Sequence, residues 1–302
     1  MKILLAVDGS KWSEMATKML MALQVSPRKQ VTVMTVIPEH TYLGGLTLQR
    51  FRSRVAKGTT RKAQDEAASK LLQGTVDMLR AAGANVETLV TRGNPAQQIV
   101  RQAHEMRADL LAIGAKGITA SSHFPLGSVA HKVVKYADTS VLLAKEGTKR
   151  VRRVLLATDG SKYSDAAARF LLALPLPQKS RVFLVTSLES HIAALLKMPT
   201  LDLETNRNIL LQLQEAEEQA ARSLMGKTRK LFQAKKYDTE LMVLRGEPAE
   251  QILMAAKTLN PDLVVVGAKG VTGIETFLLG SVAQRVARFS RYSVLMVRAR
   301  RS

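Results

Sequence analysis

The chain has 302 residues, 46% of them hydrophobic, no cysteine, and a formal net charge of +20 at pH 7. This length and composition suit a globular protein with room for two domains, and they exclude a disordered chain, disulfides and thiolate metal sites. The charge favours acidic partners, namely nucleotides, nucleic acid or an anionic membrane surface, without distinguishing among them. We expect a cytoplasmic protein, because the first apolar run stops at Asp8 and is too short for a signal peptide or a spanning helix.

The sequence is one unit written twice. KILLAVDGSKW near the N-terminus is repeated as RVLLATDGSKY, and ADLLAIGAKG is repeated as PDLVVVGAKG. Matching residues are 151 positions apart in the early blocks and 153 apart in the later ones. A fixed offset over a whole chain indicates tandem duplication. We therefore predict two domains of the same fold, residues 1–147 and 148–302.

Short apolar runs alternate with helical patterns in both units, which predicts strands buried on both faces of a sheet. In the first unit the expected strands are 3–7, 31–36, 86–91, 110–114 and 141–144, and the expected helices are 12–23, 64–82, 95–107 and 128–136. In the second unit the expected strands are 154–158, 182–187, 240–245, 263–267 and 294–298, with a long helix over about 206–234. Asn94-Pro95 predicts a capped helix start, and Gly83 predicts a left-handed helix end. Five strands with helical crossovers predict a doubly wound, parallel α/β domain in each unit.

A glycine pattern follows the fourth strand of each unit. It reads GAKGITASSHFPLGS over 114–128 and GAKGVTGIETFLLGS over 267–281. Glycines after a strand allow a sharp turn and close approach of the backbone to another group. The final serines, Ser128 and Ser281, precede helical patterns and are expected to cap those helices, whose N-termini suit phosphate. If the winding direction reverses between the first and fourth strands, Asp8-Gly9-Ser10 faces this loop.

Asp-Gly-Ser after the first strand, together with Gly-x-x-Gly-x9-Gly-Ser after the fourth, resembles the universal stress protein family, specifically its ATP-binding branch. Both copies match the glycine signature at every fixed position, and the resemblance covers nearly the whole chain. It implies a Rossmann-like fold of the adenine nucleotide alpha hydrolase type, with each parallel sheet ordered 3-2-1-4-5. It also implies pairing of domains through the fifth strand, so we expect 141–144 to lie beside 294–298 in an internal pseudo-dimer. A homodimer is a further expectation.

The resemblance implies ATP, with or without Mg²⁺, as the ligand. Asp8 and the backbone near Val36 would contact adenine, and the loop glycines would border the ribose and phosphates. The nucleotide-binding positions implied in the first unit are Asp8, Val36, Gly114, Gly117, Gly127 and Ser128. Those implied in the second unit are Asp159, Ser187, Gly267, Gly270, Gly280 and Ser281.

Two departures from the family pattern stand out. The family often has proline before its last strand, where this chain has Ser140 and Ser293. Ser187 replaces Val36 in the second copy, which predicts a less apolar adenine pocket there.

Simpler interpretations of the same residues remain open. Asp8 and Asp159 could serve only turn chemistry at the first helix, and the glycines could serve only tight packing of helix on strand. Lys116 and Lys269, inside the two glycine motifs, could neutralise a phosphate or be solvated.

The remaining motifs give little evidence about function. The GKT at 226–228 lacks the upstream glycine of a phosphate-binding loop and falls in a helical pattern, so it is interpreted as coincidence. The histidines show no metal-ligand spacing, and His131 becomes Gln284 in the second copy. The basic segment 49–62 is either an arm for nucleic acid or acidic lipid, or a solvated loop and helix start. Three arginines near the C-terminus, Arg298, Arg300 and Arg301, are interpreted as tail charge.

We therefore expect an ATP-binding stress-response or regulatory protein, in which nucleotide modulates binding of an unknown protein partner. No catalytic constellation is found, so we expect no enzyme, and any ATP hydrolysis would be slow and incidental or regulatory. One alternative is a nucleotide-free interaction or chaperone-like protein on the same fold. Another is a charge-driven binder of nucleic acid or an acidic surface, with binding that weakens steeply with salt.

Overall fold

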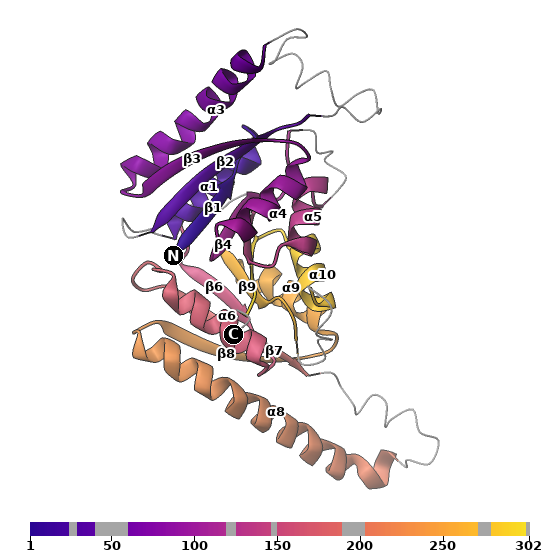
Figure 1. Ribbon diagram of the computed structural model, residues 1–302. Helices are drawn as coiled ribbons and strands as arrows, with labels where there is room; N and C mark the ends of the chain where they lie inside the picture. The colour runs from indigo at the N-terminus through magenta and orange to yellow at the C-terminus, as the bar shows by residue number, and fades with distance from the viewer. Residues whose placement is uncertain are drawn as a thin grey trace.

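A computed structural model of the chain describes residues 1–23, 29–39, 60–118, 125–145, 150–188, 203–270 and 279–299 (Figure 1). The basic segment 49–62 therefore lies mostly outside the described residues, as do Arg300 and Arg301. No helix among the described residues combines the length and the apolar character needed to cross a bilayer.

The elements of the first unit follow the predicted alternation of strand and helix. In chain order they are β1 (Lys2–Ala6), α1 (Lys11–Ala22), β2 (Gln30–Ile37), α3 (Arg61–Ala81), β3 (Asn85–Arg92), α4 (Pro95–Glu105), β4 (Leu110–Gly114), α5 (Ser128–Tyr136) and β5 (Ser140–Ala144). The helix bounds differ from the predicted ones by up to three residues, and two predicted boundary signals are confirmed. Asn94 caps α4 by accepting a hydrogen bond from the Gln97 amide, and Gly83 after α3 has a φ of 83°.

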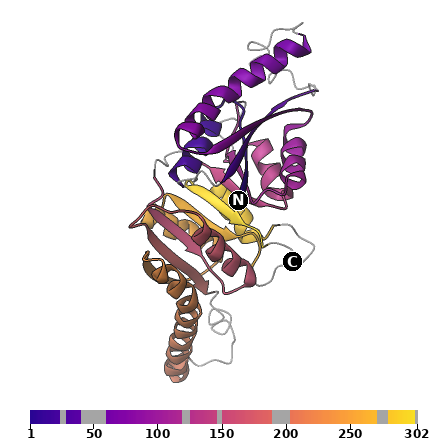
Figure 2. The ribbon, with the colours of Figure 1, turned by 60° about the vertical axis from the view of Figure 1, so that its left-hand side comes forward.

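The second unit repeats the pattern. Its elements are β6 (Arg153–Ala157), α6 (Lys162–Ala173), β7 (Arg181–Leu188), α8 (Leu203–Ala234), β8 (Asp238–Arg245), α9 (Pro248–Leu259), β9 (Leu263–Gly267), α10 (Ser281–Phe289) and β10 (Ser293–Val297). The GKT at 226–228 lies inside α8, with Thr228 buried, so it forms no phosphate-binding loop. Figure 2 shows α3 and α8 at opposite ends of the molecule.

All ten strands form one sheet, in the order β3-β2-β1-β4-β5-β10-β9-β6-β7-β8. Each half has the predicted order 3-2-1-4-5 and is parallel throughout. The halves join through β5 and β10, which pair antiparallel with Leu142 opposite Leu295. The predicted internal pairing of the two fifth strands is therefore confirmed.

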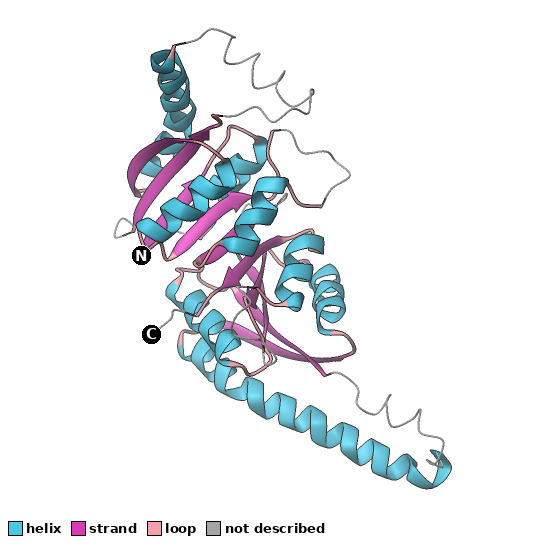
Figure 3. Ribbon diagram, turned by 45° about the vertical axis from the view of Figure 1, so that its right-hand side comes forward, coloured by secondary structure: helices cyan, strands magenta, loops and turns pink. Residues whose placement is uncertain are grey.

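Helices cover both faces of this sheet (Figure 3). On one face α1, α3, α6 and α8 bury residues such as Leu20, Leu72 and Phe232 in a single apolar cluster. On the other face α4, α5, α9 and α10 bury residues such as Val133 and Val286 in a second cluster. Each cluster contains residues of both units, so the two halves share their core rather than folding around separate ones.

The seam between the units is held by hydrogen bonds related by the internal two-fold repeat. The amide of Lys145 donates to Ser293 Oγ at 3.1 Å, and the amide of Arg298 donates to Ser140 Oγ at 3.2 Å. Both serines are buried. The two serines that replace the family's proline thus supply hydroxyl acceptors to the backbone that continues from the opposite fifth strand.

Two basic side chains complete the seam at equivalent positions. Lys145 Nζ donates to the carbonyl of Ala287 at 2.8 Å and to that of Ser290, at the C-terminal end of α10. Arg298 Nη2 donates to the carbonyl of Val134, near the C-terminus of α5, at 3.1 Å. Cations suit helix C-termini because carbonyl groups there lack partners within the helix. The interpretation of Arg298 as tail charge is therefore wrong, because the short final strand returns it to the centre of the molecule.

The serine acceptors predict a stability change. Ser293→Ala and Ser140→Ala each leave a seam amide without its acceptor, which is expected to lower the free energy of unfolding by about 1–3 kcal/mol. Denaturant titration followed by circular dichroism measures the effect. The control is Ser223→Ala on the exposed side of α8, where no loss is expected. An unchanged midpoint in both seam variants would contradict the assigned role.

The buried lysine predicts a dependence on pH. Burial, with a smaller contribution from the charge of Lys116, lowers the pKa of Lys145 to about 8. In the unfolded chain this pKa returns to about 10.4, so between these values the unfolded state binds the extra proton. The free energy of unfolding should therefore rise with pH from 8 to 10.4, by at most about 3 kcal/mol from this group. Denaturant titrations across this range should show that rise in the native chain, and a smaller one in Lys145→Met.

Candidate nucleotide site

The glycine loops lie at the point where the sheet reverses its winding. β1 and β4 are neighbours, with Ala6 opposite Ile113, so both strands end at the same edge. One continues into Asp8-Gly9-Ser10 and the other into Gly114 and the glycine loop. Ligands of open α/β sheets bind at this kind of edge. The second unit repeats the arrangement with β6 and β9.

The first glycine of each motif serves packing. A Cβ added at Gly114 would lie 2.6 Å from the backbone carbonyl carbon of Trp12, and one at Gly267 would lie 2.9 Å from that of Tyr163. Real Cβ atoms do not approach backbone this closely, so only glycine lets α1 and α6 lie against the strand ends. The packing interpretation therefore accounts for Gly114 and Gly267 without a ligand.

The second glycine lies against the aspartate. A Cβ at Gly117 would lie 2.8 Å from Asp8 Oδ2, and one at Gly270 would lie 2.8 Å from Asp159 Oδ2. Asp8 also accepts hydrogen bonds from the Ser10 amide at 3.0 Å and the Ile118 amide at 3.2 Å. The aspartate therefore both shapes the turn before α1 and fixes the start of the glycine loop.

The last glycine, and not the serine, is the helix cap. Gly127 and Gly280 occupy the N-cap positions of α5 and α10 without any side-chain cap, while Ser128 and Ser281 are the first helical residues. The expectation that the serines cap these helices is therefore wrong by one position. Gly127 holds its place by donating from its amide to the Ala115 carbonyl at 2.8 Å. An N-terminus with no capping side chain leaves its first amides available to an anion.

Each motif lysine stacks on an aromatic ring. Lys116 Nζ lies 5.6 Å from the ring centre of Trp12, and Lys269 Nζ lies 5.8 Å from that of Tyr163. These distances permit a cation–π contact. This aromatic partner was not predicted from the sequence, although an aromatic residue follows Asp-Gly-Ser-Lys in both copies.

The two positions that the resemblance assigns to adenine, Val36 and Ser187, differ in their contacts within the protein. Val36 is a half-buried residue of β2 that packs against the apolar cluster beneath α4 and α5. Ser187, its counterpart in β7, donates its hydroxyl hydrogen to the Gly246 carbonyl at 2.7 Å. The Ser187 hydroxyl therefore has a hydrogen-bond partner within the protein.

The Universal stress protein family model matches this chain twice, over residues 1–145 and 150–298. The chain belongs to the universal stress protein family. A relative in the same family, universal stress protein MJ0531 of Methanocaldococcus jannaschii, is 27% identical over 156 residues, which is 52% of this chain and 87% of that protein.

Two solved structures share the whole architecture. A universal stress protein from Archaeoglobus fulgidus has a TM-score of 0.64 at 20% identity and covers 98% of both chains. A functionally unknown protein from Pseudomonas aeruginosa, PA1789, has a TM-score of 0.63 at 17% identity and covers 98% of this chain and 92% of that one. These similarities show that both solved chains share the tandem fold of this chain.

The site residues of this family member can hold a phosphate group. The uncapped start of α5, the adjacent glycine loop and Lys116 together provide amides and a positive charge. Among the described residues, no group of three or more histidine, aspartate or glutamate side chains is placed to bind a metal ion.

The close approach at Gly114 predicts the effect of one added methyl group. Gly114→Ala should lower the free energy of unfolding by about 2 kcal/mol or more, because its Cβ meets backbone that cannot move independently. The matched control is Gly74→Ala within α3, where a Cβ meets nothing within 4 Å and helix propensity favours alanine by about 1 kcal/mol. Thermal unfolding of both variants should shift in opposite directions. Equal shifts would refute the packing role.

Proposed function

We propose that this protein binds ATP at its glycine loops and acts in a stress response as a nucleotide-dependent regulator rather than as an enzyme. The observation that carries the proposal is the start of α5, where Gly127 caps the helix without a side chain beside the loop that carries Lys116. The α10 start repeats it with Gly280 and Lys269. The resemblance to the ATP-binding branch supports the same ligand.

The phosphates would lie at the helix N-terminus, where free amides and the helix dipole favour negative charge. Lys116 could then exchange its contact with Trp12 for one with phosphate, because a lysine on a ring is held by only about 0.5–1 kcal/mol at an exposed site. In the second unit Lys269 and Tyr163 would play the same parts. We infer that both units bind.

The regulatory step would begin at the loop. Asp8 ties the turn before α1 to the Ile118 amide at the start of the glycine loop. A ligand that contacts the aspartate and the loop together would favour one arrangement of both, and so shift the population that binds a protein partner. Binding alone suffices for this role, so we propose no turnover of substrate.

The proposal is tested by titrating nucleotide-free protein with ATP while following the fluorescence of Trp12, the sole tryptophan. We expect a change in emission, because ligand phosphate removes Lys116 from the ring, and calorimetry should give a stoichiometry of two ATP per chain. Lys116→Met should weaken binding in the first unit several-fold, and it adds no side chain at the glycines of the turn. Gly117→Val should reduce the stoichiometry to one, because the larger side chain meets Asp8.

Gly270→Val tests the second unit in the same way, and Gly74→Ala in α3 is the control that should leave both sites intact. Loss of binding in Gly117→Val counts only if its circular dichroism and unfolding midpoint stay close to those of the native chain. Absence of any binding at millimolar ATP would overturn the proposal. The favoured function would then be that of an interaction protein that binds no nucleotide.

A further inference from the structure

A groove of about 610 Å³ lies between α4 and α5 on the outer surface of the first unit. Its lining includes the apolar residues Ala96 and Val100 and the polar residues Asn94, Gln97 and Lys132. The equivalent surface of the second unit, between α9 and α10, provides an internal comparison, because the two units share one fold and one spacing of 153 residues in this region.

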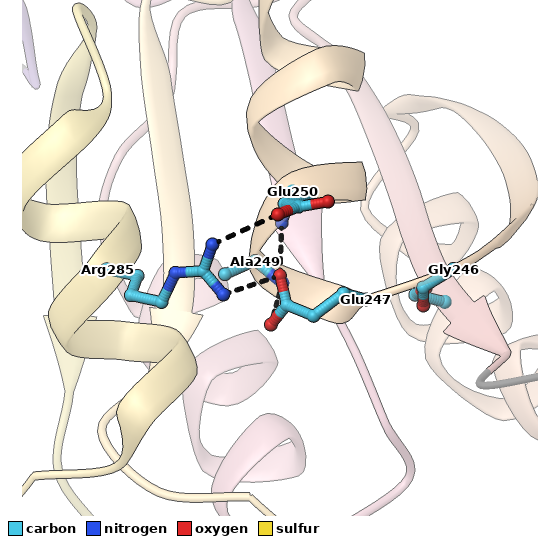
Figure 4. Close-up of polar contacts among 6 residues, drawn as sticks. Gly246, Glu247, Ala249, Glu250 and Arg285 are labelled. Carbon is cyan, nitrogen blue, oxygen red and sulfur yellow. Dashed lines mark hydrogen bonds and ion pairs between the residues drawn. The ribbon is translucent and has the colours of Figure 1, made fainter.

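In the second unit, an ion-pair network bridges the two helices. Arg285 of α10 places Nη1 2.8 Å from Glu247 Oε2 and Nη2 3.3 Å from Glu250 Oε1 (Figure 4). Glu247 also caps α9, accepting from the amides of Ala249 and Glu250. One arginine thus binds two carboxylates that the chain itself supplies.

The first unit has a cation at the equivalent position but no carboxylates at the other two. Lys132 occupies the position of Arg285, Asn94 that of Glu247, and Gln97 that of Glu250. The Lys132 side chain is exposed and forms no ion pair or hydrogen bond with any residue that the structure describes. The same helix pair that is bridged by internal acids in one unit therefore presents an uncompensated cation beside two neutral amides in the other.

The rest of the groove adds charge and an aromatic surface. Arg101 lies on its wall and reaches Glu105 at 3.4 Å on the same helix. Tyr136 is 52% exposed, with Lys135 Nζ 5.3 Å from its ring centre. Among the described residues that line the groove, Asp138 is the one carboxylate, and His104 lies 2.6 Å from it.

We propose that this groove binds an acidic segment of a partner protein, whose aspartate or glutamate side chains take the places that Glu247 and Glu250 fill in the second unit. Charge complementarity is the basis of the assignment, because Lys132 faces a groove whose lining carboxylate, Asp138, is engaged by His104, while Arg101 adds positive charge although it pairs with Glu105. A peptide suits the site better than a small acid, because the lining from two helices offers apolar residues and a tyrosine as well as cations.

This inference does not rest on nucleotide binding, since the groove lies on the helix surfaces and not at the glycine loops. Its test uses nucleotide-free protein, so its failure and that of the proposed function are separable. The probe is a short fluorescein-labelled oligoglutamate peptide, with oligoglutamine as the neutral probe. Anisotropy is measured at physiological ionic strength, where charges beyond about 8 Å are largely screened.

We expect one oligoglutamate per chain and no binding of oligoglutamine. Lys132→Gln should weaken binding about tenfold, which corresponds to ~1.4 kcal/mol. The matched control is Lys70→Gln on α3, which removes the same charge from an exposed helix on the opposite face of the sheet and should change the affinity less than about twofold. Equal weakening by the two variants would show that binding follows overall charge, and would overturn the proposal.

Exchanging the residues between the units gives a second, independent readout. Asn94→Glu with Gln97→Glu supplies internal acids to Lys132 and should abolish peptide binding. Glu247→Asn with Glu250→Gln frees Arg285, keeps a residue that can cap α9, and should raise the stoichiometry to two. Circular dichroism checks the fold of both double variants. No binding to the native chain, or exchange variants that bind as the native chain does, would also overturn the proposal.

Discussion

The antiparallel pairing of β5 with β10 is the constraint on which the rest of the structure depends. Each five-stranded half would otherwise end in an open edge, with backbone groups that seek another strand. Joining the edges makes both halves one sheet, and it lets apolar side chains from both units form a continuous layer on each face. The pairing also brings the C-termini of α5 and α10 to the basic residues of the opposite unit, where Arg298 and Lys145 bind their carbonyl groups.

Backbone hydrogen bonds join the seam directly to the candidate nucleotide sites. The amide of Ala115, in the glycine loop, donates to the carbonyl of Ala144 at 2.8 Å, and Lys145 follows directly. Ala268 donates to Val297 in the same way at 2.7 Å. The positive charge of Lys116 in turn contributes to the lowered pKa of Lys145. An anion beside Lys116 would therefore act on a buried cation of the seam, since a negative charge near a lysine favours its protonated form.

The sequence was sufficient for the scaffold because the scaffold follows from repetition and periodicity. The tandem offset is visible by comparing the two halves of the sequence, and the buried strands and the cap at Asn94 are local patterns. The strand order was implied by the family resemblance. The sequence was insufficient where a residue's role depends on a distant part of the chain. Arg298 was interpreted as tail charge, but β10 places it against α5. Ser128 was expected to cap α5, but Gly127 occupies the N-cap position. The aspartate and glycine of each site could be paired from sequence, but the tightness of their packing could not: a Cβ added to the glycine would lie 2.8 Å from the aspartate oxygen.

Duplication allows the two units to differ in surface chemistry while keeping one architecture. The shared core and seam fix the backbone of both, so substitutions on the outer helices are free of the packing that restrains buried positions. Having two amides where the second unit has Glu247 and Glu250 means that the first unit lacks two ion pairs, which are partly exposed in the second unit and therefore contribute little to stability. The same difference leaves a cation whose best remaining partners are outside the chain. A difference of two surface ion pairs between the units thus costs the fold little, yet it changes the charge that each surface presents to other molecules.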